Sequence, residues 1–466
     1  MAYFANENDC RFRMLPFPLL PSPTGLVFCL LWSTPFAFAT EPAEPAEFPR
    51  EQPVAEYTSP ILEAVAPSAV STEQRKQTAE EELEERIQKL EAGAHAESKH
   101  HAPALGPSVF NPSMEIVLSE KYGFFSKDAT NIPGFQTGNE GRRAGKGFSL
   151  DESSIRLMAN VDHKLYGALT LSVAERNGKD EVGLEEAFLK TFGLPLGLSI
   201  KAGRMLPIFG SMNEMHKHAD SFIDRPLPYR AYLNDAFSED GIQASMVLPT
   251  DLYAEVGGGI FRGRGFPASA AGNTPGLFIA YARVGGDIGI SHVWRLGAYY
   301  LHAKNSQGRE ADGLVFGGKN DLYSVDVKYT YAPQGNDKRT GLALQAEYLF
   351  RNEKGHYDNG FTSAFANTKT SGFYAQAIYK FMHSYRLGAR YAFLNAPRKP
   401  PAGFESTSLD SGNRNPWMLT FLAEYNISEF SRFRFQYNHS TTHNKADHQV
   451  VLQYTLTLGA HAAHEF

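Results

Sequence analysis

A pair of histidines separated by one residue is the clearest hint of metal chemistry in this chain. Glu214 precedes His216 and His218, and Asp220 follows them, so two imidazoles and two carboxylates lie within seven residues. Imidazole nitrogen is a good ligand for zinc, copper and nickel. The spacing matches no structural zinc site with four defined ligands, and both cysteines lie near the amino terminus. We therefore expect either a metal site at His216 and His218 or ordinary polar loop residues.

Charged side chains alternate with apolar ones in several segments, and most of these charges are basic. In 385–393, arginines alternate with tyrosine, leucine, alanine and phenylalanine. The basic residues of this kind are Lys190, Lys201, Arg295, Lys380, Arg386, Arg390, Arg432 and Arg434. Glu347 and Glu424 carry the opposite charge in the same pattern. Because rings of lysine and arginine in a pore attract anions, we predict that these residues line a pore. Alternatively, they pair and only brace a hydrated wall.

The segment 207–240 is too long for an ordinary turn and contains three prolines. Loops of this length are usually functional or disordered. Since loops of membrane barrels can fold into the lumen, we predict a constriction loop in which Asp220, Asp224, Arg225 and Arg230 face the pore. The alternative is an external loop that packs over the mouth.

The segments that must position these residues alternate between apolar and polar side chains, with a period of two, from about Met114 to Phe466. Apolar residues occupy one face, with aromatic rings at both ends, as in 373–381 and 417–425. The other face carries arginine, lysine, glutamate, glutamine and glycine, which is too polar to pack without water. This pattern predicts an all-β, transmembrane antiparallel β-barrel of about 16 strands, with aromatic girdles at the two membrane interfaces. The expected strands are 114–124, 152–162, 164–175, 183–193, 197–206, 241–249, 252–262, 276–284, 292–303, 321–331, 340–351, 370–381, 384–394, 416–426, 430–439 and 447–458.

The amino-terminal region has the composition of an export signal followed by linkers. Residues 1–39 combine basic residues, a short apolar run and an Ala-Phe-Ala cleavage site, and translation could also start at Met14. Residues 40–70 form a Pro/Glu-rich segment, expected to be a disordered linker. An amphipathic helix is expected at 71–92, either a short coiled-coil stalk or a solvated helix, and 93–113 is a second linker before the barrel at 114–466.

Enzyme and nucleic-acid functions find little support in the sequence. It contains no G-x-S-x-G, Walker or H-E-x-x-H motif, so we expect no enzyme activity and no cofactor. A Ser-His-Asp set needs no sequence adjacency, which keeps an outer-membrane hydrolase as a rival interpretation. The net charge of -6, without a strongly basic segment, argues against a nucleic-acid partner.

Several short motifs add a resemblance to a known group of porins. Residues 186–190, the Ala-Gly-Arg end of 198–204 and the Pro-Ile-Phe-Gly run at 207–210 resemble the phosphate- and pyrophosphate-selective porins, as does the Arg-Pro stretch at 224–230. The segments 428–432 and 461–466 resemble uncharacterised proteobacterial outer-membrane proteins, some described as metal-regulated receptors. This resemblance implies a bacterial outer-membrane location and a homotrimer. The lysine ladder of the phosphate-selective members has no counterpart here.

These observations predict a passive channel in outer-membrane lipid for small hydrophilic solutes or ions. One alternative is a receptor-type barrel for metal or metal-chelate uptake, which would have about 22 strands and a folded plug. Another is an adhesive or structural barrel with a sealed lumen.

Overall fold

The computed structural model describes residues 112–176 and 179–459, and almost all of its regular structure is antiparallel strand. The strands are β1 (Ser113–Phe125), β2 (Gly147–Leu150), β3 (Ser153–Asn160), β4 (Leu165–Arg176), β5 (Lys179–Thr191), β6 (Leu198–Met205), β7 (Glu239–Val247), β8 (Tyr253–Phe261), β9 (Leu277–Ile288), β10 (His292–Ala311), β11 (Leu314–Tyr331), β12 (Gly341–Asp358), β13 (Ser363–Phe381), β14 (Tyr385–Asn395), β15 (Trp417–Ser428), β16 (Ser431–Ser440) and β17 (Asp447–Gly459). The helical pieces are η1 (Pro195–Gly197), η2 (Lys217–Ala219), α2 (Leu227–Leu233) and η3 (Pro333–Gly335). None of the helices in these ranges has the length and apolar character needed to cross a membrane.

The expected signal peptide, both linkers up to residue 111 and the helix at 71–92 lie outside the described residues, as do residues 460–466.

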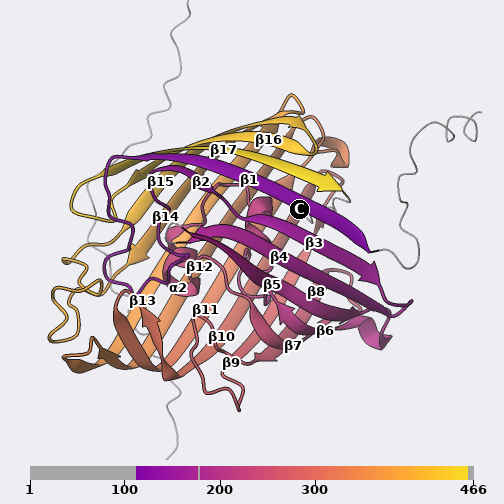
Figure 1. Ribbon diagram of the computed structural model, residues 1–466. Coiled ribbons are helices and arrows are strands. Elements are labelled where there is room, and N and C mark those ends of the chain that lie inside the picture. Colours follow the sequence, from indigo (N-terminus) through magenta and orange to yellow (C-terminus); the bar gives the residue numbers. More distant parts are fainter. Residues whose placement is uncertain (1–111, 177–178, 460–466) are drawn as a thin grey trace, which may run out of the picture. The chain divides into compact units, whose positions relative to one another are not determined.

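The sheet closes on itself, because its last strand pairs with its first (Figure 1). β1 and β17 are in register over eleven residue pairs. On its other side β1 pairs with β2 at 120–123 and with β3 at 113–117. β2 and β3 therefore share one strand position, interrupted at Asp151 and Glu152, and the seventeen strands make a barrel of sixteen positions. The predicted fold class and strand number are confirmed.

The two faces of the wall carry the residues that the alternation predicts. On β12, Leu344 and Tyr348 point outward and are 40% and 47% exposed, whereas Glu347 between them points inward and is 2% exposed. On β16, Phe433 and Phe435 point outward, and Arg434 is buried inside. The outer face is thus apolar and ready for lipid, while the inner face is largely polar.

The wall is much taller on one side than on the other. β3, β6, β7 and β8 have 8 or 9 residues, whereas β10 to β13 have 18 to 20. A tilted strand of about 9–11 residues spans the bilayer, so β10 to β13 extend beyond it. Four expected strands were too short at the end where β10 to β13 extend beyond the bilayer, namely 292–303, 321–331, 340–351 and 370–381. The parts of β10 to β13 beyond the bilayer are rich in polar residues. They have no apolar outward face, which is the pattern that the prediction used.

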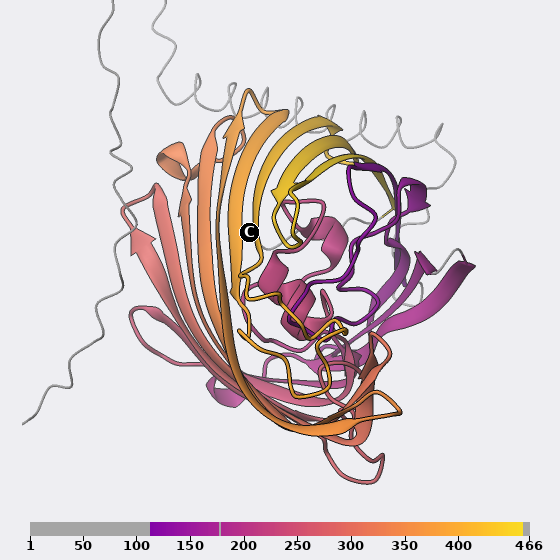
Figure 2. The same ribbon diagram turned by 90° about the vertical axis from the view of Figure 1, so that its left-hand side faces the viewer.

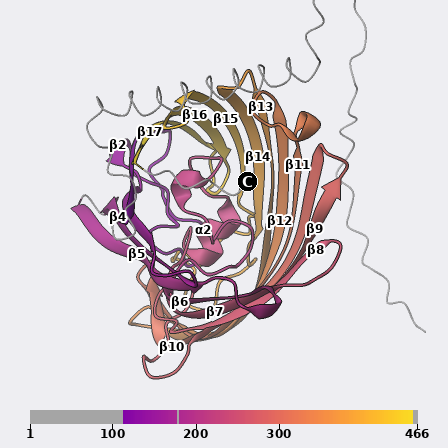
Figure 3. The same ribbon diagram turned by 90° about the vertical axis from the view of Figure 1, so that its right-hand side faces the viewer.

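A long connection between β6 and β7 folds into the barrel (Figures 2 and 3). We call residues 206–238 the constriction loop. It contains α2, which starts after Pro226, with proline again at 228, and ends at Asn234 in the left-handed conformation. All seven residues of α2 are buried.

The constriction loop is held partly by an apolar cluster inside the barrel, which the sequence analysis did not predict. Phe209, Leu227 and Leu233 of the loop pack in one cluster with wall residues such as Leu349 and Leu394. The connection 126–146 between β1 and β2 adds Ile132 and Phe135 to this cluster. Part of the lumen is therefore filled with packed side chains.

Candidate pore constriction

The constriction loop is fixed to β12 by hydrogen bonds to one buried carboxylate, that of Glu347. The hydroxyls of Ser211, Tyr229 and Tyr374 donate to its Oε2 at 2.6, 2.9 and 3.0 Å. The Tyr229 hydroxyl also accepts the backbone N–H of Ser211 at 2.9 Å. The structure therefore places Glu347, predicted to line the pore, between the wall and the loop.

Gly210 allows this close approach of the loop to the wall. Its φ is +65°, and a Cβ at this position would lie 2.3 Å from the Tyr229 hydroxyl and 2.4 Å from Glu347 Oε1. Only glycine combines the left-handed backbone with the missing side chain. The Phe-Gly end of the 207–210 motif thus has a structural explanation.

A second attachment joins Asp224 of the loop to β14 and β16. Arg390 forms an ion pair with the Asp224 carboxylate, and its Nη1 donates to the Asp224 backbone oxygen at 2.6 Å. Gln436 and Asn438 donate to the same carboxylate at 2.7 and 3.0 Å. Asp224 and Arg390, both predicted to face the pore, hold the loop against the wall instead.

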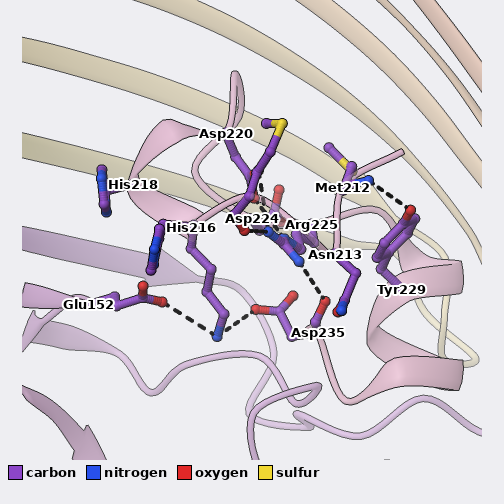
Figure 4. A network of polar contacts seen from close by, with 12 residues as sticks. Glu152, Met212, Asn213, His216, His218, Asp220, Asp224, Arg225, Tyr229 and Asp235 are labelled. Atoms are coloured by element: carbon purple, nitrogen blue, oxygen red, sulfur yellow. Dashed lines mark hydrogen bonds and ion pairs between the residues drawn. The ribbon is translucent and has the colours of Figure 1, made fainter. Parts of the chain in front are cut away.

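Other charged residues of the loop contact one another or neighbouring segments inside the barrel, and Figure 4 shows Asp220 and Arg225 among them. Arg225 Nε donates to Asp220 Oδ2 at 2.7 Å, and both side chains are buried. Burial raises the pKa of the Asp220 carboxyl, although the charge of Arg225 acts in the opposite direction. Arg230 Nε donates to the backbone oxygen of Gly141 at 2.9 Å, which ties α2 to the connection 126–146.

A basic group lines the inner face of β14 to β16. Glu424 lies between Arg386 and Arg432, with N–O distances of 3.4 and 3.9 Å. Arg434 Nη1 donates at 2.7 Å to the backbone oxygen of Asp220 in the constriction loop, and Arg432 donates to another backbone oxygen of that loop. Two of these three arginines therefore contact both the wall and the loop.

Three pairs of basic residues stand directly opposite one another on the inner face, near the end of the barrel where β1 begins and β17 ends. The register joins Lys190 with Lys201, Arg295 with Lys328, and Lys380 with Arg386. Like charges in facing positions are destabilising. Nearby carboxylates offset this repulsion in part, since Lys201 lies 3.0 Å from Glu186, Arg295 3.1 Å from Asp326 and Lys380 3.8 Å from Asp337. Lys328 was missed, although it continues the inward alternation of its strand.

The surroundings of His216 differ from those the sequence suggests. Its neighbours in sequence bind elsewhere, since Glu214 pairs with Arg283 of β9. The His216 ring instead lies between two glutamates of β5, with Nε2 3.0 Å from Glu186 Oε2 and Nδ1 3.3 Å from Glu185 Oε1. The His218 ring stacks on it at a centroid distance of 5.5 Å.

The two glutamates change the protonation of this histidine. Burial alone lowers the pKa of His216, but the hydrogen bonds and charges of Glu185 and Glu186 outweigh it and raise the pKa to about 10. His216 is therefore an imidazolium at neutral pH when nothing else binds there.

A β-bulge brings both glutamates to the inner face. β4 and β5 shift register between Thr170 and Leu171, so that Glu185 is an extra residue between Leu184 and Glu186. Such a bulge re-aims side chains that strict alternation would send to opposite faces. Glu185 and Glu186 were missed because the prediction assumed an unbroken period of two. Glu152 was missed because the prediction made it the first residue of a strand at 152–162 and did not include β2 or the break before β3.

Comparisons with known proteins found one relative by sequence and several solved structures of low identity. No family model matches the sequence. An uncharacterised protein of Aquifex aeolicus is 27% identical over 389 residues, which cover 77% of this chain and 80% of that protein.

Several solved outer-membrane proteins are similar to this chain at low identity. Salmonella typhi OmpF, in a complex with daunomycin, is 13% identical over 75% of this chain and 98% of that one, with a TM-score of 0.47. The anion-selective porin from Comamonas acidovorans is 11% identical over 74% and 99%, with a TM-score of 0.46. The channel DcaP of Acinetobacter baumannii is 10% identical over 74% and 97%, with a TM-score of 0.47.

The class of this protein follows from its own wall. A closed antiparallel sheet leaves no unpaired strand edge, which is the condition for a β-structure to span lipid. An apolar outer face, a polar inner face and an even number of strand positions are typical of barrels in the bacterial outer membrane. The chain is therefore a transmembrane β-barrel of that membrane.

Proposed function

We propose that this chain is a passive channel for small hydrophilic solutes and ions, with no chemical step. The observation that carries this proposal is a sixteen-position barrel with a polar inner face and a loop folded inward to narrow it. Barrels of about 16–18 strands leave room for an aqueous passage. Solutes would move down their gradient through the space beside the constriction loop.

The charges on the inner face support a preference for anions. Three facing pairs of basic residues lie in one end of the barrel, and they would raise the local concentration of anions there. Phosphate specificity is not part of this proposal, because the lysine ladder of the phosphate-selective porins has no counterpart in the sequence.

Swelling of liposomes would test solute passage. The purified protein is reconstituted, and the vesicles are diluted into isosmotic arabinose, glucose or raffinose. We expect swelling well above that of protein-free vesicles, fastest for the smallest sugar, because the loop narrows the passage. Swelling no faster than in the protein-free control for every sugar would exclude the channel.

The receptor alternative is not favoured by the barrel itself. Receptor-type barrels with plugged lumens have about 22 strands, whereas this wall has sixteen strand positions. Its inward segments within the described residues are connections between strands rather than a separate plug domain.

We also propose a homotrimer, as the resemblance to porins implies. The outer face of β3 to β6 supports close contact between barrels, because a groove of about 530 Å³ there is lined by small residues such as Ala159, Gly167, Ala187 and Ala202. Native mass spectrometry in detergent would report the assembly, and a monomer alone at all concentrations would exclude it.

A further inference from the structure

Three potential metal ligands from separate parts of the chain converge at one edge of the constriction loop. Glu152 comes from the break between β2 and β3, Glu185 from the bulge of β5, and His216 from the loop. One ligand atom from each lies within 4.8 Å of the other two. Figure 4 shows Glu152 and His216 side by side at this place.

Two carboxylate oxygens beside this imidazole lack hydrogen bonds. Among the described residues, Glu152 Oε1 and Glu185 Oε2 are buried side-chain atoms without a hydrogen-bond partner, and the His216 Nδ1 atom has only its 3.3 Å contact with Glu185 Oε1. His216 as a whole is 8% exposed. Buried polar atoms are nearly always satisfied in folded proteins, so two unpartnered carboxylate oxygens next to a buried imidazole indicate a site for a ligand.

We propose that Glu152, Glu185 and His216 bind one divalent transition-metal ion. His216 Nδ1 would be the ligand atom, because Nε2 lies 3.0 Å from Glu186. Metal-binding histidines usually donate their second ring N–H to a carboxylate in this way. Glu186 is itself held by Lys201 at 3.0 Å and Arg156 at 3.9 Å.

The distances fit a small, nearly formed site. Zinc bonds of about 2.0–2.2 Å in a tetrahedron separate the ligand atoms by roughly 3.4 Å. His216 Nδ1 is already 3.3 Å from Glu185 Oε1. The Glu152 ligand atom lies within 4.8 Å of the other two, so it has to move closer by at most about 1.4 Å, which rotation of its flexible side chain can supply. A fourth position remains open for water or a passing solute.

The donor set selects the class of metal. One imidazole with two carboxylates suits zinc and its first-row neighbours, whereas calcium and magnesium prefer oxygen ligands alone. The nearby ammonium group of Lys217 is shared among three carboxylates. Its Nζ lies 3.9 Å from Glu152, 3.5 Å from Glu140 and 3.0 Å from Asp235. Bound metal would replace the imidazolium charge of His216 and join the loop to β5 and to the β2–β3 break.

Calorimetric titration of the chelator-treated full chain in detergent with ZnCl₂ tests the proposal. We expect about one Zn²⁺ per chain, and at least a tenfold loss of affinity in His216→Ala and in Glu185→Gln. Excess Ca²⁺ or Mg²⁺ should not compete. His302→Ala is the matched control, because His302 faces outward on β10 and pairs with Asp321. The Zn²⁺ affinity of this variant should equal that of the native chain. Circular dichroism and the heat-dependent gel migration of folded barrels show whether each variant folds.

X-ray absorption of the Zn²⁺-loaded native protein decides the question without any variant. The proposal predicts a zinc shell with one imidazole and oxygen atoms at about 2.0–2.2 Å. A shell of oxygen only, no binding by the native chain, or undiminished binding in folded His216→Ala protein would overturn it. Binding at one site would hold or fail whether or not the barrel conducts, so this test is independent of the channel function.

Discussion

At the scale of single residues, buried polar side chains decide where the constriction loop lies. Glu347 accepts hydrogen bonds from two loop residues and two wall residues, and Arg390 binds Asp224 of the loop. Glu347 and Arg390, which the sequence suggests are free charges in a pore, therefore also hold the constriction loop against the wall. In the proposed channel, the width of the passage would depend on these residues even where they do not touch the solute.

Replacing Glu347 with Gln should loosen the loop. The amide is a weaker acceptor and places an N–H where hydroxyls donate, which should cost about 1–3 kcal/mol of loop attachment. Hydrogen–deuterium exchange in 206–238 should then be about 5- to 150-fold faster if the loop opens locally. Tyr357→Phe is the control, since it removes a buried hydroxyl 2.9 Å from Glu353, away from this attachment. Equal exchange in Glu347→Gln and native protein would contradict this assignment.

The sequence predicted which side of the wall each of these residues faces, but not what each one contacts. Alternation along a strand fixes the face, because successive side chains point to opposite sides. It says nothing of a loop that returns from far along the chain. Glu347 and Ser211, for example, are 136 residues apart.

At the scale of elements, small residues on the inner face give the loop its room. Gly372 of β13 faces α2, and a Cβ there would lie 2.9 Å from Cγ of Pro228 and 2.7 Å from Cδ2 of Leu394. The missing side chain at Gly372 on the strand thus leaves the space that α2 of the loop occupies. The tall strands β10 to β13 and the β5 bulge depart from the predicted lengths and faces, because polar extensions and extra residues break the period that the prediction used.

Gly372→Ala should push α2 away from the wall. The added methyl group has no free space, so we expect a destabilisation of about 1–3 kcal/mol, seen as a lower thermal unfolding temperature in detergent. Gly317→Ala on β11 is the matched control, because its nearest contact would be 3.8 Å away at the Asn305 backbone oxygen. If the two variants unfolded at the same temperature, α2 would not be packed as described.

The facing basic pair Lys380 and Arg386 should influence ion preference. Replacing both with Gln removes two positive charges from the inner face, so the reversal potential in a KCl gradient should shift toward that of a cation-preferring pore. The control is Lys319→Gln with Lys354→Gln, a facing basic pair on the outer face of β11 and β12. A shift of equal size in both double variants would show that the inner pair has no special effect.

At the scale of the whole molecule, the barrel could be predicted and the contents of its lumen could not. Strand number, closure and the apolar outer face follow from a repeated local pattern, which is readable from residues such as Leu344 and Glu347. The apolar cluster that includes Phe135, Phe209 and Leu349 joins distant segments, and no local period marks it. The inward segment expected at 207–240 is thus joined in the barrel by packed apolar side chains that the sequence does not mark.

Single-channel recording in a planar bilayer tests the central claim most directly. We predict discrete, long-lived current steps from the purified chain in KCl, with a reversal potential that indicates a weak preference for anions. A folded barrel that inserts into the membrane and carries no current would mean that the inner segments seal the lumen, and it would contradict the channel.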